Sequence, residues 1–162
     1  MLTLRNFEIT DKPKIIETLN DPEVIRFLSS RIPSPYAARD ADWWLSVGCK
    51  NGIIRAIEVD GNFVGCIGIE PGQHEYSFTG ELGYWLAREH WGKGIATEAL
   101  HTLLAQIKRN NFARVQATVF QGNTASASVL LKCGFKKEGN LEKAVYKHQA
   151  FYNAVLYGKV IS

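Results

Sequence analysis

A glycine-containing loop between a predicted strand and a predicted helix carries the clearest chemical signal in this 162-residue sequence. The loop contains Gly92-Lys93-Gly94, and the apolar stripe of an amphipathic helix begins at Ile95. The first N–H groups of a helix lack intrahelical acceptors and carry partial positive charge, and glycines let a phosphate approach them closely. The segment therefore predicts a phosphate site, to which Lys93 adds charge and Thr97 a hydroxyl group. A ligand-free turn is the alternative interpretation.

Two familiar phosphate motifs do not fit this loop. A P-loop requires Gly-Lys followed by Ser or Thr, whereas Lys93 is followed by Gly94. The dinucleotide-binding fingerprint requires a third glycine, and the sequence has Thr97 at that spacing. Any phosphate-bearing ligand of this loop is therefore recognised by a different motif.

Composition and charge restrict the class of protein. The 46% hydrophobic and 22% charged residues are typical of a folded globular chain. No apolar run approaches the roughly 20 residues of a membrane span, and the first residues lack a signal-peptide core. A net charge of +3 without a basic run does not indicate nucleic-acid binding. Cys49, Cys66 and Cys133 lack metal-type spacing and are typical of free thiols in a reducing compartment. We predict a cytoplasmic protein without metal, membrane or nucleic-acid partners.

The hydrophobic pattern predicts the elements that position the loop. Asp60-Gly61 joins two extended runs, a strong hairpin signal. Another strand spans residues 79–87, and the tail from residue 135 forms two more. The order is strand, helices, three strands, helix, strand, helix and two strands. This order predicts a mixed α/β fold, and because we find no repeat or linker, one domain over residues 1–162.

Two blocks of sequence resemble the GNAT superfamily of N-acetyltransferases. The loop is similar to the family's motif A, Gln/Arg-x-x-Gly-x-Gly/Ala, with Gly94 and Ala96 at the small positions and Trp91 in place of Gln or Arg. NTASASVLLKCGF, residues 123–135, resembles the family's Asn-x-x-Ser…Leu-x-Lys-x-Gly-Phe block. ELGYWL, residues 81–86, is similar to the central strand of the ribosomal-protein N-terminal acetyltransferase branch (RimJ/RimL type), in which Trp is common in the loop.

The resemblance implies an enzyme that transfers the acetyl group of acetyl-CoA to a primary amine by direct attack in a ternary complex. It also implies a mostly antiparallel sheet of about seven strands, splayed between the fourth and fifth and flanked by helices. The pantetheine arm would pair with the strand end, and the pyrophosphate would lie on the loop. The implied cofactor-binding residues are Leu86, Ala87, Trp91, Gly92, Lys93, Gly94, Ile95, Ala96, Thr97 and Asn123.

Two side chains are candidates for moving protons in this reaction. Glu81 lies on the strand before the loop and is a candidate general base acting through water, or else a solvated or ion-paired carboxylate. Ser126, in the first turn of the helix after residue 123, is a candidate proton donor to the thiolate, or else a helix cap. Asn123 can cap that helix, hydrogen-bond the pantetheine amides, or do both.

The acceptor amine is less defined by the sequence. Deprotonating an α-ammonium of pKa about 8 at pH 7 costs about 1.4 kcal/mol, whereas a lysine side chain costs about 4.6 kcal/mol. A single modest base therefore suits a protein or peptide N-terminus. Glu81, Glu89 and Glu98 are the only acids that we expect near the site, which is no dense cluster for a polycation. Trp85 and Tyr36 are expected to border the acceptor.

Other acceptors and classes stay open at this point. Polyamines, amino sugars and free amino acids are all primary amines with the same chemistry. A non-catalytic acetyl-CoA-binding module would keep the loop and dispense with Glu81, and a peptide-binding or ribosome-associated domain would need a large basic or apolar patch. A monomer and a homodimer are both compatible with the sequence.

Overall fold

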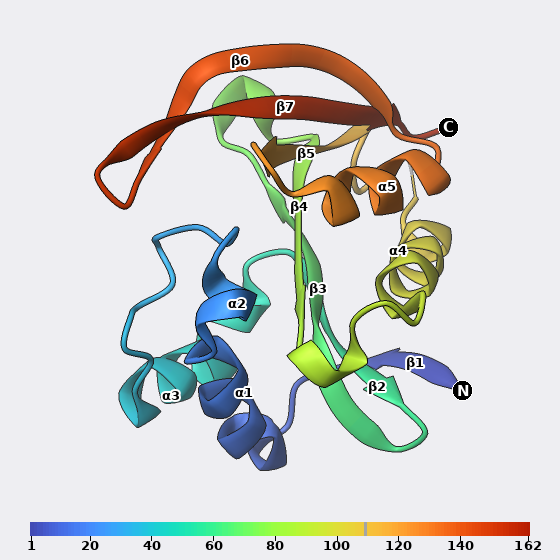
Figure 1. Ribbon diagram of the computed structural model, residues 1–162. Coiled ribbons are helices and arrows are strands. Elements are labelled where there is room, and N and C mark those ends of the chain that lie inside the picture. Colours follow the sequence, from blue (N-terminus) through green and yellow to red (C-terminus); the bar gives the residue numbers. More distant parts are fainter. Residues whose placement is uncertain (109) are drawn as a thin grey trace.

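A computed structural model describes residues 1–108 and 110–162 (Figure 1). Seven strands form one sheet in the order β1-β2-β3-β4-β5-β7-β6. Among the described strands, all neighbours run antiparallel except β4 and β5. The predicted mixed sheet is therefore confirmed. In chain order the elements are β1 (Leu2–Arg5), η1 (Ile9–Asp11), α1 (Lys12–Leu19), α2 (Pro22–Ile25), α3 (Ala38–Ser46), η2 (Gly48–Lys50), β2 (Ile53–Val59), β3 (Asn62–Pro71), η3 (His74–Tyr76), β4 (Thr79–Leu86), η4 (Arg88–His90), α4 (Ile95–Gln106), β5 (Arg114–Phe120), α5 (Thr124–Lys132), β6 (Lys136–Lys147) and β7 (Ala150–Val160), where η marks a short 3₁₀ turn.

The tight turns have the backbone geometry that their sequences demand. Asp60 and Gly61, between β2 and β3, both have positive φ angles of 51° and 81°. Two successive positive φ angles match the twist of the flanking strands. His148 and Gln149, between β6 and β7, repeat the pattern with φ angles of 52° and 62°. No helix within the described residues has both the length and the apolar character needed to cross a bilayer.

The parallel strands β4 and β5 pair over only three residues. Thr79, Gly80 and Glu81 lie opposite residues 114–116. Beyond Glu81, β4 stays paired with β3 up to Leu86, and β5 stays paired with β7 up to its last residue. The two strands thus separate after Glu81, as the predicted splay between the fourth and fifth strands requires (Figure 1).

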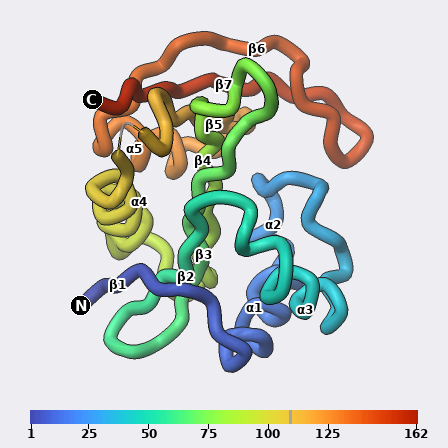
Figure 2. The backbone as a smooth tube through the Cα atoms, turned by 180° about the vertical axis from the view of Figure 1, so that it is seen from behind, coloured from blue at the N-terminus to red at the C-terminus, as the bar shows by residue number. Residues whose placement is uncertain are grey.

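Two hydrophobic clusters cover the two faces of the sheet. One contains Leu82 and Leu86 of β4 and packs against α4 and α5. The other contains Trp85 and packs against α1, α2 and α3, on the opposite side of β3 and β4 (Figure 2). Because side chains alternate along a strand, Glu81 lies on the same face as Trp85, away from α4 and α5.

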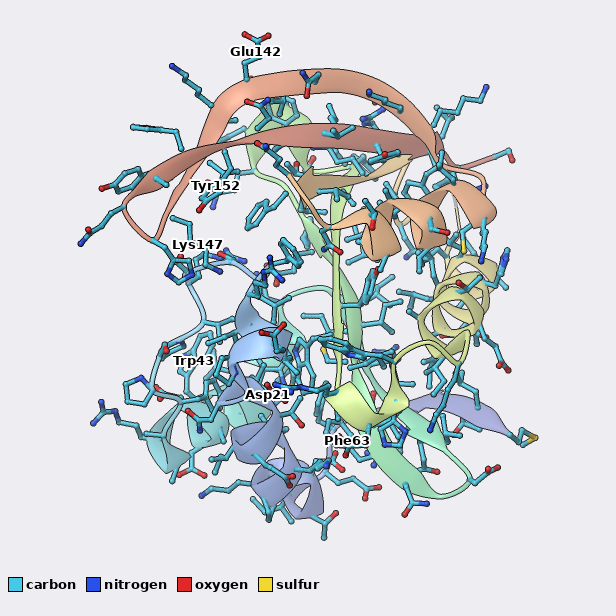
Figure 3. The ribbon with its side chains drawn as sticks, viewed as in Figure 1. Asp21, Trp43, Phe63, Glu142, Lys147 and Tyr152 are labelled. Carbon is cyan, nitrogen blue, oxygen red and sulfur yellow. The ribbon has the colours of Figure 1, made fainter. Side chains whose placement is uncertain are left out.

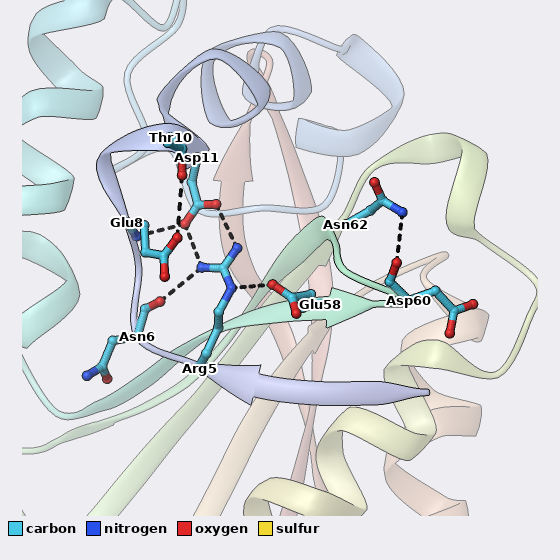
Figure 4. A network of polar contacts seen from close by, with 8 residues as sticks. All are labelled: Arg5, Asn6, Glu8, Thr10, Asp11, Glu58, Asp60 and Asn62. Carbon is cyan, nitrogen blue, oxygen red and sulfur yellow. Dashed lines mark hydrogen bonds and ion pairs between the residues drawn. The ribbon is translucent and has the colours of Figure 1, made fainter.

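A buried carboxylate ties the first strand to the first helix. Asp11 is only 3% exposed and accepts two hydrogen bonds from the Arg5 guanidinium, at 2.8 and 2.9 Å (Figure 4). Arg5 Nε also donates to Glu58 of β2 at 2.6 Å, and the Glu8 N–H donates to Asp11 at 2.8 Å. The charge of Asp11 is therefore compensated by one cation that also joins β1 to β2.

Removing that cation should destabilise the fold. We expect Arg5→Leu to lower the free energy of unfolding by about 3 kcal/mol, because the Asp11 carboxylate would stay buried without a partner. Urea denaturation measures the change. Arg39→Leu, the same substitution at an exposed position of α3, should change stability by less than about 0.5 kcal/mol. Equal effects of the two variants would show that the network contributes nothing specific.

Candidate active site

The loop before α4 has the geometry of an anion cradle. Gly92 and Gly94 adopt left-handed conformations with φ angles of 70° and 76°, which glycine tolerates best. Gly94 is the N-cap of α4, and its carbonyl accepts the first helical hydrogen bond, from Glu98 N–H at 3.0 Å. Within the described residues, the N–H groups of Ile95 to Thr97 donate to no backbone carbonyl. Three donors and the positive end of the helix dipole are therefore available to an anion.

Trp91 anchors this loop to the end of β4. Its indole Nε1 donates to the Leu86 carbonyl at 2.9 Å. The Ala87 N–H donates to Val64 of β3 at 2.9 Å, so the odd-numbered residues of β4 direct their polar backbone groups towards β3. A ligand arm beside β4 would therefore meet the backbone of Tyr84 and the N–H of Leu86. The Ala87 N–H is therefore used within the sheet, and the cofactor contact at Leu86 and Ala87 stays a prediction.

Ser126 is held from two sides at the start of α5. The Asn123 side-chain oxygen accepts from the Ser126 N–H at 3.2 Å, which is the helix cap that the sequence predicts. The Tyr84 hydroxyl donates to Ser126 Oγ at 3.0 Å. Burial raises the pKa of Tyr84, and the hydrogen bond with Ser126 opposes that rise. The contact joins β4 to α5 beyond the point where β4 and β5 stop pairing.

Glu81 lies on the opposite face, at the last paired position of β4 and β5. Gln116 Nε2 donates to its carboxylate at 3.2 Å, and the Thr118 N–H also donates to it. Desolvation by the surrounding protein raises the pKa of Glu81, while these two hydrogen bonds and the charges of Arg114 and Arg31 oppose the rise. A carboxylate with a raised pKa accepts a proton more readily than an ordinary glutamate, so Glu81 can act as a base.

A second carboxylate that sequence reasoning missed lies beside Glu81. Glu70 of β3 is directly opposite it in the antiparallel register. Arg31, from the segment between α2 and α3, lies 3.8 Å from the Glu70 carboxylate, and Asn51 donates to it at 3.3 Å. The expectation that Glu81, Glu89 and Glu98 are the only acids near the site is therefore wrong, because it depended on a strand register that the sequence does not reveal.

The acidic side chains next to the loop before α4 are either ion-paired or exposed to solvent. Glu89 forms an ion pair with Lys14 of α1 at 2.6 Å, which holds the pKa of Glu89 below its usual range. Arg88 forms an ion pair with Asp21, the N-cap of α2. Glu98 is exposed on α4. The two ion pairs connect the segment after β4 to α1 and α2, so the loop and these helices are mechanically linked.

The two predicted acceptor residues are buried in the cluster beneath α1–α3. Tyr36 is 6% exposed, although it lies in a proline-containing segment between α2 and α3, and burial raises its pKa to about 12. Asn20 holds the Tyr36 backbone with hydrogen bonds of 2.9 and 2.8 Å. Trp85 is 9% exposed and packs edge-on against Phe63, with ring centroids 6.0 Å apart. Both side chains support the face that carries Glu81 and offer little surface of their own.

Lys147 connects the β6–β7 hairpin to the helical side of the molecule (Figure 3). Its ammonium donates to the carbonyls of Ile25, Arg26 and Leu28 at 3.0, 3.1 and 2.6 Å. Burial lowers the pKa of Lys147. These carbonyls end α2 and begin the segment that carries Arg31. Lys147 therefore holds the start of the segment between α2 and α3. Arg31 of the same segment contacts Glu70.

The predicted site residues thus fall into two groups on opposite faces of β4. Residues 91–97, Asn123 and Ser126 lie on the side of α4 and α5, and Glu81 lies with Trp85 and Tyr36 on the side of α1–α3. Tyr84 and Gln116 are contacts of this site that sequence reasoning missed. Tyr84 is an aromatic strand residue, for which core packing is the default interpretation and a pocket wall the second, and nothing in the sequence pairs Gln116 with Glu81. No three His, Cys, Asp or Glu side chains in the described part of the chain form a group suited to a metal ion.

Comparison with known proteins identifies the class to which this geometry belongs. A family model described as an acetyltransferase (GNAT) domain matches residues 1–136. The chain therefore belongs to the GNAT acetyltransferases and is an acetyl-CoA-dependent N-acetyltransferase. A protein described as an uncharacterized N-acetyltransferase, p20, of Bacillus licheniformis is 31% identical over 146 residues, covering 86% of this chain and 82% of the relative.

More specific relatives include enzymes with different acceptors. The ribosomal-protein-serine acetyltransferase of Escherichia coli is 34% identical over 86 residues, 51% of this chain and 47% of that enzyme. The structure of RimL, a ribosomal L7/L12 α-N-protein acetyltransferase with coenzyme A, aligns with a TM-score of 0.86 at 17% identity, covering 99% and 94% of the two chains. Spermidine N-acetyltransferase of Vibrio cholerae, solved with CoA and spermine, aligns with a TM-score of 0.80 at 20% identity, covering 98% and 95%. The fold is shared by both acceptor classes.

Proposed function

We propose that this enzyme acetylates the α-amino group of a protein or peptide chain, by direct attack of the amine on the acetyl-CoA thioester in a ternary complex. The observation that carries the proposal is Glu81, a carboxylate with a raised pKa at the point where β4 and β5 separate. An α-ammonium needs only about 1.4 kcal/mol to lose its proton at pH 7, so one modest base suffices. The ribosomal-protein relative supports the same acceptor class.

The cofactor side of the proposal uses the loop before α4. The pyrophosphate would lie on the N–H groups of residues 92–97, and the free backbone groups of β4 would pair with the pantetheine arm. Trp91 would hold the loop in place through Leu86, and Asn123 would add a polar contact beside the arm. The thioester would then lie at the separation of β4 and β5, within reach of groups from both faces of the sheet.

Proton transfer in the proposed reaction involves two residues. The α-ammonium loses one proton through water to Glu81, and the neutral amine attacks the thioester carbonyl. The C–S bond then breaks, and Ser126 donates a proton to the departing thiolate, with Tyr84 as the hydrogen-bond partner of its hydroxyl group. The acylated nitrogen releases its second proton to solvent and Ser126 takes one back from solvent, which leaves the amide and the free thiol of CoA. Glu81 and Ser126 lie on different sides of β4, which suits an amine that attacks the carbonyl from one side and a thiolate that departs towards the other.

A second candidate acceptor is a small polycationic amine. The observation that favours it is Glu70 beside Glu81, since two adjacent carboxylates attract a cation. Arg31 next to Glu70 opposes this attraction. We also infer a cytoplasmic location, because Cys49, Cys66 and Cys133 are free thiols, as in a reducing compartment.

The first prediction tests the cofactor loop. Acetyl-CoA at 100 times its dissociation constant should stabilise the folded protein by about 2.7 kcal/mol, raising Tm by roughly 5–11 °C. Gly94→Asp should remove this increase, because it places a carboxylate where the phosphates bind. Gly61→Asp is the matched control, since both glycines have positive φ angles, of 76° and 81°, and a Cβ added at either would have no atom within 4 Å of it. Thermal scans with and without acetyl-CoA measure both, and a wild-type increase in a folded Gly94→Asp would refute the assignment.

The second prediction concerns the base. Glu81→Gln should lower kcat by about 100-fold, because general-base assistance is lost, and should leave acetyl-CoA affinity unchanged. Glu81 works only when deprotonated, so wild-type activity should rise with pH through its raised pKa and fall below it. That acid limb should disappear in Glu81→Gln. Full kcat with the original pH profile would remove Glu81 from the mechanism.

The third prediction concerns the acceptor. Short peptides with a small first residue should give a higher kcat/KM than polyamines or aminoglycosides at one pH near neutrality. Thiol release from acetyl-CoA measures all three classes in one assay. A polyamine or amino sugar that is better by tenfold, about 1.4 kcal/mol of transition-state preference, would establish the second candidate instead. Acetyl-CoA binding without turnover on any amine would indicate a non-catalytic module.

A further inference from the structure

We infer that Gln116 is a positioning residue for Glu81, and that Arg114 holds the Gln116 amide in the orientation that this task requires. Arg114 Nε donates to Gln116 Oε1 at 3.0 Å, and Gln116 Nε2 donates to Glu81 at 3.2 Å. The inference rests on the proposed role of Glu81 as the base. It adds a network that supports the base from a different strand.

The two hydrogen bonds allow only one orientation of the amide. A glutamine side chain accepts through its oxygen and donates through its nitrogen, a guanidinium only donates, and a carboxylate only accepts. Turning the Gln116 amide over would set its N–H₂ against the Arg114 N–H and its oxygen against the Glu81 carboxylate. Both contacts would then be repulsive. Arg114 therefore determines which end of Gln116 faces Glu81.

Arg114 is itself held by Glu138 of β6. Arg114 Nη1 donates to Glu138 at 2.9 Å, and Nη2 forms a second contact with the same carboxylate, so the pair is bidentate. The pair lies over Gly158 of β7. A Cβ at Gly158 would come within 2.5 Å of the Glu138 carboxylate and 2.6 Å of the Arg114 guanidinium. The absence of a side chain at Gly158 is what lets the ion pair lie flat on the sheet.

The strand register places the whole network on one face. Glu81 lies opposite Gln116 in the last pair of β4 and β5, and Gln116 lies opposite Gly158 of β7. Arg114 and Gln116 are two residues apart on β5, so their side chains point to the same side. The chain of contacts thus runs from the outer strand β6 to the point where β4 and β5 separate.

Several other groups act on the Glu81 carboxylate. Glu70 lies beside it on β3, Arg31 reaches it electrostatically from the segment between α2 and α3, and the Thr118 N–H donates to it from β5. Among the residues that the structure describes, Gln116 is the one neutral side chain that donates directly to Glu81. Its removal takes away a hydrogen bond that favours the charged form without changing any formal charge. Such a change should raise the pKa of Glu81 further.

The test compares Gln116→Met with wild type. Methionine has similar length and neither polar group, so the Glu81 bond is lost with little change in volume. The acid limb of kcat against pH should move up by about 0.5–1 pH unit, and kcat near neutrality should fall by roughly threefold to tenfold, with KM for acetyl-CoA unchanged. Arg114→Lys, which keeps the charge but cannot hold the amide through Nε, should move the limb in the same direction by less. Gln106→Met at the exposed end of α4 is the matched control and should leave the limb in place.

A direct titration separates this inference from the proposed function. The ¹³C NMR shift of the Glu81 side-chain carboxyl, assigned by its loss in Glu81→Gln, should titrate at higher pH in Gln116→Met than in wild type, whether or not Glu81 is the base. An unchanged titration overturns the network, and the Arg114→Lys result repeats that test if Gln116→Met is unstable. A changed titration with an unchanged acid limb overturns the positioning role and also argues against Glu81 as the base. An acid limb of kcat against pH that persists in Glu81→Gln would also argue against Glu81 as the base.

Discussion

The loss of pairing between β4 and β5 after Glu81 is the constraint on which the rest of this structure depends. A parallel pair of strands normally continues because every backbone N–H and C=O needs a partner. Here β5 turns away with β7. The edge of β4 that faced β5 therefore keeps backbone N–H and C=O groups that pair with neither β3 nor β5. Trp91 takes one of them, the Leu86 carbonyl. The others form the edge that a peptide-like arm can extend, which is why a cofactor with amide groups suits this fold.

In the mechanism that we propose, the same separation lets both faces of the sheet contribute to one reaction. The α4–α5 face brings free helix N–H groups and Ser126, and the α1–α3 face brings Glu81. In a continuous sheet these groups would be kept apart by the strands between them. Ion pairs from Arg88 and Glu89 to α1 and α2, together with Lys147 from the β6–β7 hairpin, tie the surrounding segments together. These contacts would give Glu81 the fixed surroundings that its proposed role as a base requires.

Much of the fold could be predicted from the sequence, because the signals are local. The turn at Asp60-Gly61, the apolar stripe from Ile95 and the cap at Asn123 each depend on residues within a few positions of one another. Backbone sterics and the helical period act over that distance, so residue types alone are enough. The anion-binding geometry of the loop before α4 belongs to the same group. The family resemblance then supplied the separation of the strands, which no local pattern contains.

Only the tertiary structure decided how the side chains meet around the site. Tyr84 and Ser126 are 42 residues apart, and Glu81 and Gln116 are 35 apart, so their contacts depend on strand register and on the helix that crosses between the strands. A shift of one residue would turn each side chain to the other face. Tyr36, in a proline-containing segment typical of exposed loops, is buried because α1 and α3 pack over it. The sequence by itself thus determined the elements, the glycine loop before α4 and, through the family resemblance, the class of reaction. The environment of Glu81 was decided by packing, since desolvation and hydrogen bonding depend on residues that are distant in the chain.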